Sequence, residues 1–180
     1  MQGAGGGEFA DASFVSTSES WAVGDSGPAE HLNKTLIERF GGPGWPVVPS
    51  PDQGTSDNGL NGVSRRLWRG TEVGYAHRPG VYQPLALQWD RTQWPLDLPA
   101  TFPSDALLTD VDTLAEGSAW AVGFQTNGRG DSAHAGGTRI GRAWTPVASP
   151  NDGTSTTAWM MAVSRPASSG TAAISGDCGS

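Results

Sequence analysis

The chain of 180 residues has little lysine, little cysteine and no long apolar run. A single lysine accompanies ten arginines, they form no basic cluster, and the formal net charge is -7. This excludes the basic footprint that nucleic-acid binding requires. The one cysteine, Cys178, cannot form an internal disulfide. No segment approaches the roughly 18 apolar residues that span a bilayer as a helix, so we expect no membrane span.

Signals for a targeting segment and for helices are also missing. Residues 1–8 are rich in glycine and lack the basic and apolar regions of a signal peptide, so the cellular location stays unknown. No window keeps apolar residues at helical spacing for three turns, because Gly or Pro interrupts nearly every stretch. Eight tryptophans argue against disorder. Short β-branched and aromatic runs bounded by turn residues predict an all-β fold.

The chain contains a sequence repeat. The string Trp-Ala-Val-Gly at residues 21–24 recurs at residues 120–123, and Glu-Val-Gly-Tyr at residues 72–75 is a worn copy between them. The glycines at positions 24, 74 and 123 are 50 and 49 residues apart. Trp45, Trp94 and Trp144 keep the same period. A period of roughly 40–50 residues is typical of a stacked or radial array.

Each repeat is expected to form four antiparallel strands. The expected strands cover residues 14–16, 21–24, 35–40 and 45–48; then 61–64, 71–75, 84–89 and 94–98; then 108–113, 118–124, 137–142 and 144–148. Four short strands per repeat are typical of a β-propeller blade. We therefore predict a single domain over residues 1–180, an open arc of three to three and a half blades. The blades cover residues 11–59, 60–107 and 108–157, with a partial blade at 158–180. Residues 129–142 are expected to be irregular or poorly paired, because Gly136 and Gly137 weaken a strand.

The repeat resembles that of an actinobacterial β-propeller family. The resemblance rests on Trp-Ala-Val-Gly, then Thr-Leu-Ile-Glu-Arg-Phe, then Trp-Pro-Val-Val-Pro-Ser-Pro, all within residues 21–51. It covers about 150 residues. It implies a propeller fold, often in secreted or surface proteins, and it implies no single activity.

The tryptophans divide into two groups. Five recur at the same blade positions and are expected to be buried between sheets: Trp21, Trp45, Trp94, Trp120 and Trp144. Three others break the pattern and are better candidates for a surface role: Trp68, Trp89 and Trp159. We include Trp89 among the candidate binding residues.

The three histidines follow strands that end in Val-Gly. His31, His77 and His134 would share one face of a propeller, where three imidazoles can bind a metal or act in catalysis. Loops of successive blades point to different sectors, however, so we expect exposed loop histidines, no bound metal and no cofactor.

Acidic residues occupy the connectors after each fourth strand, at Asp52, Asp105 and Asp152. The segments 50–54 and 149–153 resemble the Asp-box of sialidase-like propellers but depart from its spacing. We expect these carboxylates to form Asx-type turns, in which they cap nearby backbone N–H groups, and they remain candidate binding residues.

Three functions stay open at this point. The first is a non-catalytic binding or interaction module for a peptide or a glycan, part of a larger propeller. The second is a fragment of a carbohydrate-active hydrolase or lyase of the sialidase-like kind, which would need paired carboxylates in one pocket. The third is a structural remnant without activity. An open arc leaves two apolar flanks, so we expect self-association or further blades to cover them.

Overall fold

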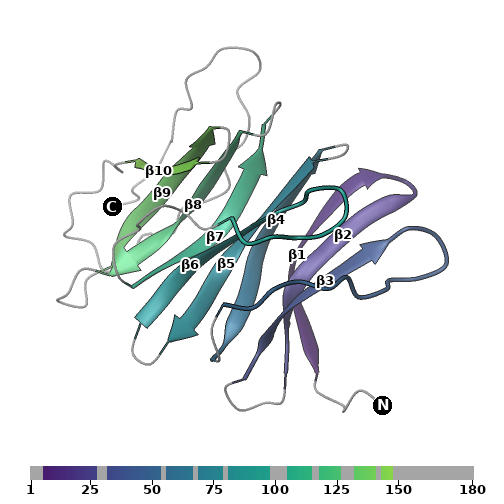
Figure 1. Cartoon of the computed structure of the whole chain (residues 1–180), viewed down its shortest axis with the longest axis horizontal. Coiled ribbons are helices and arrows are strands. Elements are labelled where there is room, and N and C mark those ends of the chain that lie inside the picture. Colours follow the sequence, from purple (N-terminus) through teal and green to yellow (C-terminus); the bar gives the residue numbers. More distant parts are fainter. Residues whose placement is uncertain are drawn as a thin grey trace, which may run out of the picture.

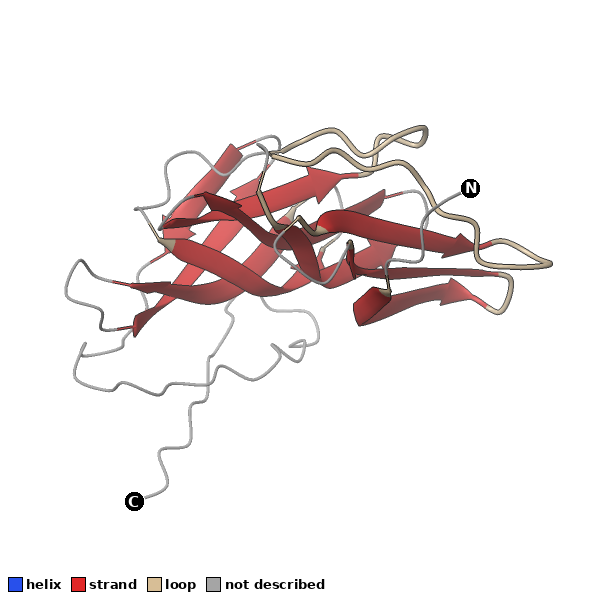
Figure 2. Ribbon diagram, turned by 90° about the horizontal axis from the view of Figure 1, so that it is seen from below, coloured by secondary structure: helices blue, strands red, loops and turns tan. Residues whose placement is uncertain are grey.

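The computed structural model describes residues 6–27, 32–53, 56–66, 69–78, 81–97, 105–114, 118–126, 132–140 and 143–147. These residues form three antiparallel sheets, arranged side by side in chain order (Figure 1). Strands and loops account for everything described, with no helix among these residues (Figure 2). The all-β prediction is confirmed.

Each sheet is a meander of consecutive strands. Sheet A contains β1 (Gly7–Ser16), β2 (Glu19–Ser26) and β3 (Lys34–Phe40). Sheet B contains β4 (Asn58–Arg66), β5 (Arg69–Arg78) and β6 (Val81–Gln88). Sheet C contains β7 (Ala106–Thr113), β8 (Ala119–Thr126), β9 (Ser132–Ile140) and β10 (Ala143–Val147).

A fourth strand exists in full only in sheet C. In sheets A and B it is reduced to one bridge each, Glu38 with Val47 and Leu87 with Leu96. Pro46 and Pro95, which precede the bridging residues, have no amide hydrogen for the ladder. In sheet C, Thr145 separates the repeated tryptophan from Pro146, and β10 pairs with β9 over five residues, with Pro146 opposite Gly137.

The repeated glycine has a steric cause. Gly24, Gly74 and Gly123 each lie opposite a bulge in the first strand of their sheet. A Cβ atom at any of the three would overlap a backbone carbonyl oxygen of that strand. The period of the sequence is therefore the period of a bulged strand pair.

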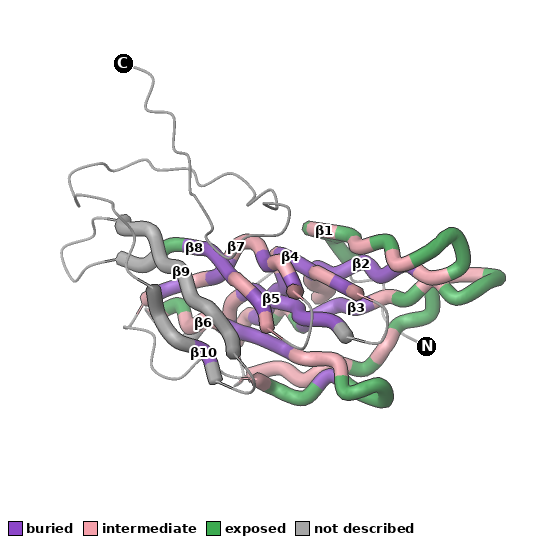
Figure 3. Tube along the Cα trace, turned by 90° about the horizontal axis from the view of Figure 1, so that it is seen from above, coloured by how far each residue is buried: buried purple, intermediate pink, exposed green. Residues whose placement is uncertain are grey.

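The sheets pack face to face in the order A, B, C. One buried apolar cluster joins sheets A and B and includes Trp21, Leu60 and Trp94. A second joins sheets B and C and includes Val73 and Trp144. Figure 3 shows the exposed end of this stack along β1.

One hydrogen bond repeats at both interfaces. The backbone N–H of Arg65 donates to Ser13 Oγ at 3.1 Å, and that of Thr113 donates to Ser64 Oγ at 2.8 Å. Ser13 and Ser64 hold the same position relative to the repeated glycine, and so do Arg65 and Thr113. The A–B and B–C contacts therefore use the same geometry.

Two further expectations were wrong, besides the fourth strands expected at residues 45–48 and 94–98, which are reduced to single bridges. The glycine-rich segment is a regular strand, since β9 pairs continuously with β8 and also with β10. Its two neighbours supply backbone hydrogen bonds on both edges, and this outweighs the weak propensity of Gly136 and Gly137. Trp45 is largely exposed, because no sheet covers its face of sheet A.

The other tryptophan predictions divide by position. Trp21, Trp94 and Trp144 are buried as expected, and Trp120 is half-buried. Trp68, Trp159 and the expected partial blade at residues 158–180 lie outside the described residues. In the part of the chain that the structure describes, no helix is long and apolar enough to cross a membrane.

Candidate functional site

A fully buried carboxylate lies between sheets A and B. Glu72 is on β5, paired across the sheet with Val63 on β4 and Leu87 on β6. Paired residues share a face of the sheet, and both neighbours belong to the apolar A–B cluster. Neither carboxylate oxygen of Glu72 has a hydrogen-bond partner. Burial raises the pKa of Glu72 well above its usual 4.5, and the nearby Arg65 only partly opposes this.

A buried guanidinium accompanies this carboxylate. Arg65 stands near the end of β4, and its Cζ lies 4.3 Å from the centre of the Trp21 ring, 5.4 Å from that of Trp89 and 5.6 Å from that of Trp94. Gly70 gives it room, because a Cβ there would overlap the Arg65 side chain. Burial lowers the pKa of Arg65, while Glu19 and Glu72 act to raise it.

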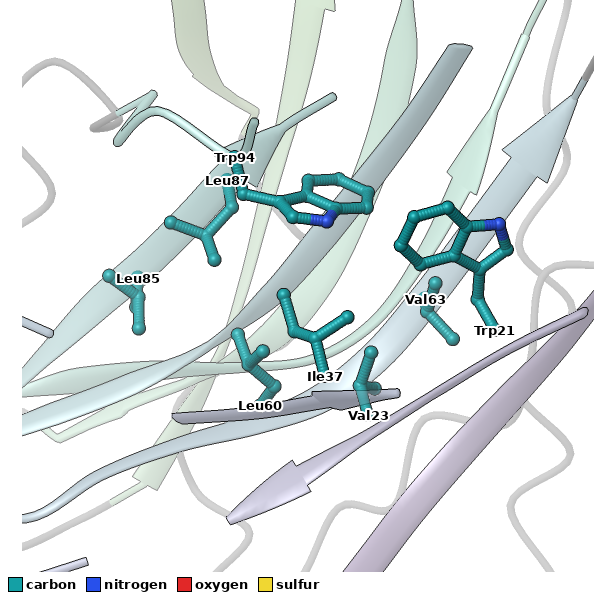
Figure 4. Close-up of a cluster of buried hydrophobic side chains, with 8 residues drawn as sticks. All are labelled: Trp21, Val23, Ile37, Leu60, Val63, Leu85, Leu87 and Trp94. Atoms are coloured by element: carbon teal, nitrogen blue, oxygen red, sulfur yellow. The ribbon is translucent and has the colours of Figure 1, made fainter. Parts of the chain in front are cut away.

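The three indole rings form one aromatic group. The Trp21 centroid is 5.1 Å from that of Trp89 and 5.5 Å from that of Trp94, the latter in an edge-to-face pair. Figure 4 shows Trp21 and Trp94 facing each other above the aliphatic side chains of the interface. We call the group Glu19, Arg65, Glu72, Trp21, Trp89 and Trp94 the A–B polar cluster.

Several polar atoms of the A–B polar cluster are buried without partners. They are Arg65 Nε and Nη1, both carboxylate oxygens of Glu72, and Trp94 Nε1. Each buried unsatisfied group costs about 1–3 kcal/mol. Such a concentration of unpaired donors and acceptors in one place requires an explanation.

The solvent side of the cluster is an ion-pair network. Glu19 Oε1 is 3.4 Å from Arg65 Nη2 and 3.3 Å from Arg39 Nη2, and it accepts a hydrogen bond from Trp21 Nε1 at 3.2 Å. Arg39 also borders an open hollow of about 610 Å³. The hollow is lined by Arg39, Gly41, Pro43, Gly44, Trp45 and Pro46. Arg39 therefore connects the hollow to Glu19 at the edge of the cluster through one ion pair.

The structure does not bring the histidines together. The expectation of an exposed loop histidine is wrong for His77, which is on β5 and half-buried, with its ring 4.8 Å from that of Tyr82. His134 is on β9 of another sheet, opposite Phe124, and His31 lies outside the described residues. Within the described parts of the chain, no three His, Cys, Asp or Glu residues are grouped as a metal site.

The connector acids are used in backbone capping. Asp52 accepts the N–H of Thr35 at 2.9 Å and is 3.4 Å from Lys34 Nζ. Asp105 accepts the N–H of Tyr82 at 2.9 Å. Both carboxylates thus cap backbone N–H groups, but the partners are 17 and 23 residues away in sequence. These caps join distant strands and are not the local Asx-type turns that the sequence predicted. Asp152 lies outside the described residues.

Of the predicted site residues, only Trp89 belongs to the A–B polar cluster. Its ring is partly buried against the apolar A–B cluster, so it is less exposed than a free surface tryptophan. Sequence reasoning missed Arg65 and Glu72. A signal was available, since Glu72 stands two residues before the repeated glycine, where the other repeats have Ala22 and Ala121.

Comparisons with known proteins identify the fold but no family. No model of a known protein family matches the chain, and no curated protein matches it. Among solved structures, the chain is similar to a fucose lectin from Kordia zhangzhouensis, whose structure is a complex with methyl-fucoside. The two are 18% identical with a TM-score of 0.51, over 77% of this chain and 99% of the lectin chain. The chain thus shares an all-β fold with a carbohydrate-binding protein.

Proposed function

We propose that this chain is a non-catalytic binding module that recognises a sugar at the A–B polar cluster. The observation that carries the proposal is the set of buried, unpaired polar atoms of Arg65, Glu72 and Trp94 beside indole rings. The fold shared with a fucose lectin supports the same class of ligand, so methyl-fucoside is the first sugar to test.

The chemistry of the cluster suits a polyol. Sugar hydroxyls donate and accept at once, and the cluster offers guanidinium donors, an indole donor and carboxylate oxygens. The C–H faces of a pyranose are apolar and match the faces of tryptophan rings. Sites of this kind combine an aromatic lining with a few polar groups that fix orientation.

Entry occurs at the Glu19 side. Trp89 is partly exposed there, and Arg39 links Glu19 to the open hollow. A sugar that displaces the Trp89 ring reaches Arg65 first and Glu72 behind it. A raised pKa lets Glu72 hold a proton, so that its carboxyl group donates one hydrogen bond and accepts another.

We also propose that the three sheets are blades of a partial β-propeller of the actinobacterial repeat kind. The repeated hydrogen bonds from Arg65 and Thr113 to serines of the preceding sheet support a constant blade-to-blade step. So does the glycine that faces a bulge in every sheet.

Calorimetric titration with methyl-fucoside and a panel of hexoses tests the function. We expect Glu72→Ala to weaken binding roughly 5- to 150-fold, because it removes two hydrogen bonds of a neutral carboxyl group that contribute about 0.5–1.5 kcal/mol each. The same variant should keep or raise the thermal midpoint, since alanine fits this position in sheets A and C.

Glu8→Ala is the matched control, because Glu8 is exposed on β1 and should leave binding unchanged. A wild-type chain that binds no sugar, or a Glu72→Ala variant that binds as wild type does, contradicts the proposal.

A further inference from the structure

One face of sheet A is apolar and uncovered. Phe9, Phe14 and Trp45 are 49%, 75% and 43% exposed. They border an open hollow of about 600 Å³ with Ala12, Ala22 and Glu38. A cluster of three large exposed rings on one sheet face needs a partner.

The repeat indicates which kind of surface covers this face. Phe14 corresponds to Arg65 and Thr113. Both of these are buried against the preceding sheet, with exposed fractions of 6% and 2%. Phe9 corresponds to Leu60 and Leu108, and Trp45 corresponds to Trp94 and Trp144; all four are at most 2% exposed. Each of the three aromatic positions exposed on this face of sheet A is thus buried where another sheet precedes it.

Sheet C presents the matching half. Trp120 holds the position that Trp21 holds in sheet A, and Trp21 pairs edge-to-face with Trp94 of the following sheet. Trp120 is half-buried. Phe124, four residues further along β8 and therefore on the same face of the sheet, is exposed. Trp120 and Trp45 are therefore the two halves of an aromatic pair that occurs within the chain between sheets A and B.

We infer that the uncovered face of sheet A binds the outer face of sheet C of a second copy of this chain, in a head-to-tail ring. Within one chain, sheet A contacts B as B contacts C, so the same step applied between copies continues the array. Head-to-tail contacts form closed rings when the rotation closes. The described residues of two copies supply six sheets, which falls within the four to eight blades of closed propellers, whereas those of three copies exceed it.

Light scattering coupled to size-exclusion chromatography tests this inference. The expected mass is twice the 18.7 kDa of one chain. Phe14→Glu on sheet A and Phe124→Glu on sheet C should each produce monomers, with a dissociation constant raised about 100-fold, since each change affects both contacts of the ring. Leu32→Glu, a charge placed at an exposed leucine of the loop before β3, should leave the dimer intact.

The mixture of the two variants gives the sharpest result. Phe14→Glu and Phe124→Glu chains together regain one unmodified contact, so we expect a dimer that neither variant forms alone. A monomeric wild type overturns the inference. So does a Phe124→Glu chain that stays dimeric while Phe14→Glu dissociates, because that pattern means two sheet A faces bind each other. Circular dichroism confirms that each variant is folded, and none of these residues belongs to the A–B polar cluster.

Discussion

The A–B and B–C interfaces use the same strand positions and differ in what those positions hold. Between sheets B and C, Ala121 and Thr113 fill the sites that Glu72 and Arg65 fill between sheets A and B. The side chains of Ala121 and Thr113 are both small and uncharged. Thr113 donates hydrogen bonds to Ser64 through its N–H and its hydroxyl. The A–B pair instead buries charge.

The repeated tryptophan shows the same difference. Trp144 Nε1 donates to Asp97 Oδ2 of sheet B at 3.2 Å. The position of Asp97 is held in sheet A by Val48, which packs against the A–B apolar cluster, and Trp94 Nε1 has no partner. Among the described residues, the B–C interface pairs Trp144 Nε1 and the Thr113 hydroxyl and leaves Thr71 Oγ1 unpaired. The A–B interface leaves five buried atoms of Arg65, Glu72 and Trp94 unpaired, so the comparison teaches that unpaired buried polar atoms are concentrated at the A–B interface.

The largest expected effect separates a covered tryptophan from an uncovered one. Trp94→Ala should lower the free energy of unfolding by about 3–5 kcal/mol, as full removal of a core aromatic does. Trp45→Ala should cost less than about 1 kcal/mol under conditions where the chain is monomeric, because its ring is exposed. Urea unfolding of both variants measures the difference. Equal losses would mean that the uncovered face of sheet A is covered within one chain.

The Asp97 contact provides a test of intermediate size at the B–C interface. Asp97→Val recreates the arrangement of Val48 and leaves Trp144 Nε1 unpaired, which should cost about 1–3 kcal/mol. Asp97→Asn keeps a carbonyl acceptor and should stay within about 1 kcal/mol of wild type. Thermal unfolding checks both. A Val variant as stable as the Asn variant would show that this hydrogen bond does not distinguish the interfaces.

The pH dependence of Glu72 tests the charge that the A–B interface buries. Its folded pKa is raised above the unfolded value of about 4.5, so the folded state binds more protons than the unfolded state above that pH. The wild type should therefore lose stability relative to Glu72→Gln as the pH rises from 4.5 to the folded pKa, and the difference should then level off. Denaturant unfolding of both chains between pH 4 and 8 tests this. A difference that grows in favour of wild type with rising pH would mean that Glu72 is ion-paired.

Much of the fold could be predicted from local chemistry. Asp90 lies in the turn between the segments expected as strands at residues 84–89 and 94–98. Its carboxylate accepts hydrogen bonds from the Thr92 hydroxyl and from the N–H groups of Thr92 and Gln93, and these bonds lower the pKa of Asp90 to about 2. The strand pairs around the repeated glycine were found because that glycine has one steric role in every sheet.

The rest depended on neighbours that one repeat does not reveal. Position in the repeat fixed the face that Trp45 occupies, but not whether another sheet covers it. The strand β9 is stabilised by backbone pairing with β8 and β10. Its glycine content predicts a weak strand and gives no sign of this pairing. Arg65 and Glu72 differ in residue type from their equivalents in the other two repeats, and only a repeat-by-repeat alignment singles them out.

The most direct test of sugar binding at the A–B polar cluster is an NMR titration of the indole N–H signals with methyl-fucoside. Trp94→Phe and Trp144→Phe assign the two signals that matter. We predict that the sugar shifts the Trp94 signal, because Trp94 Nε1 lies unpaired in the cluster, and leaves the Trp144 signal unchanged, because Asp97 already accepts its hydrogen. A sugar that shifts the Trp144 signal and not that of Trp94, or that shifts neither, would contradict the account.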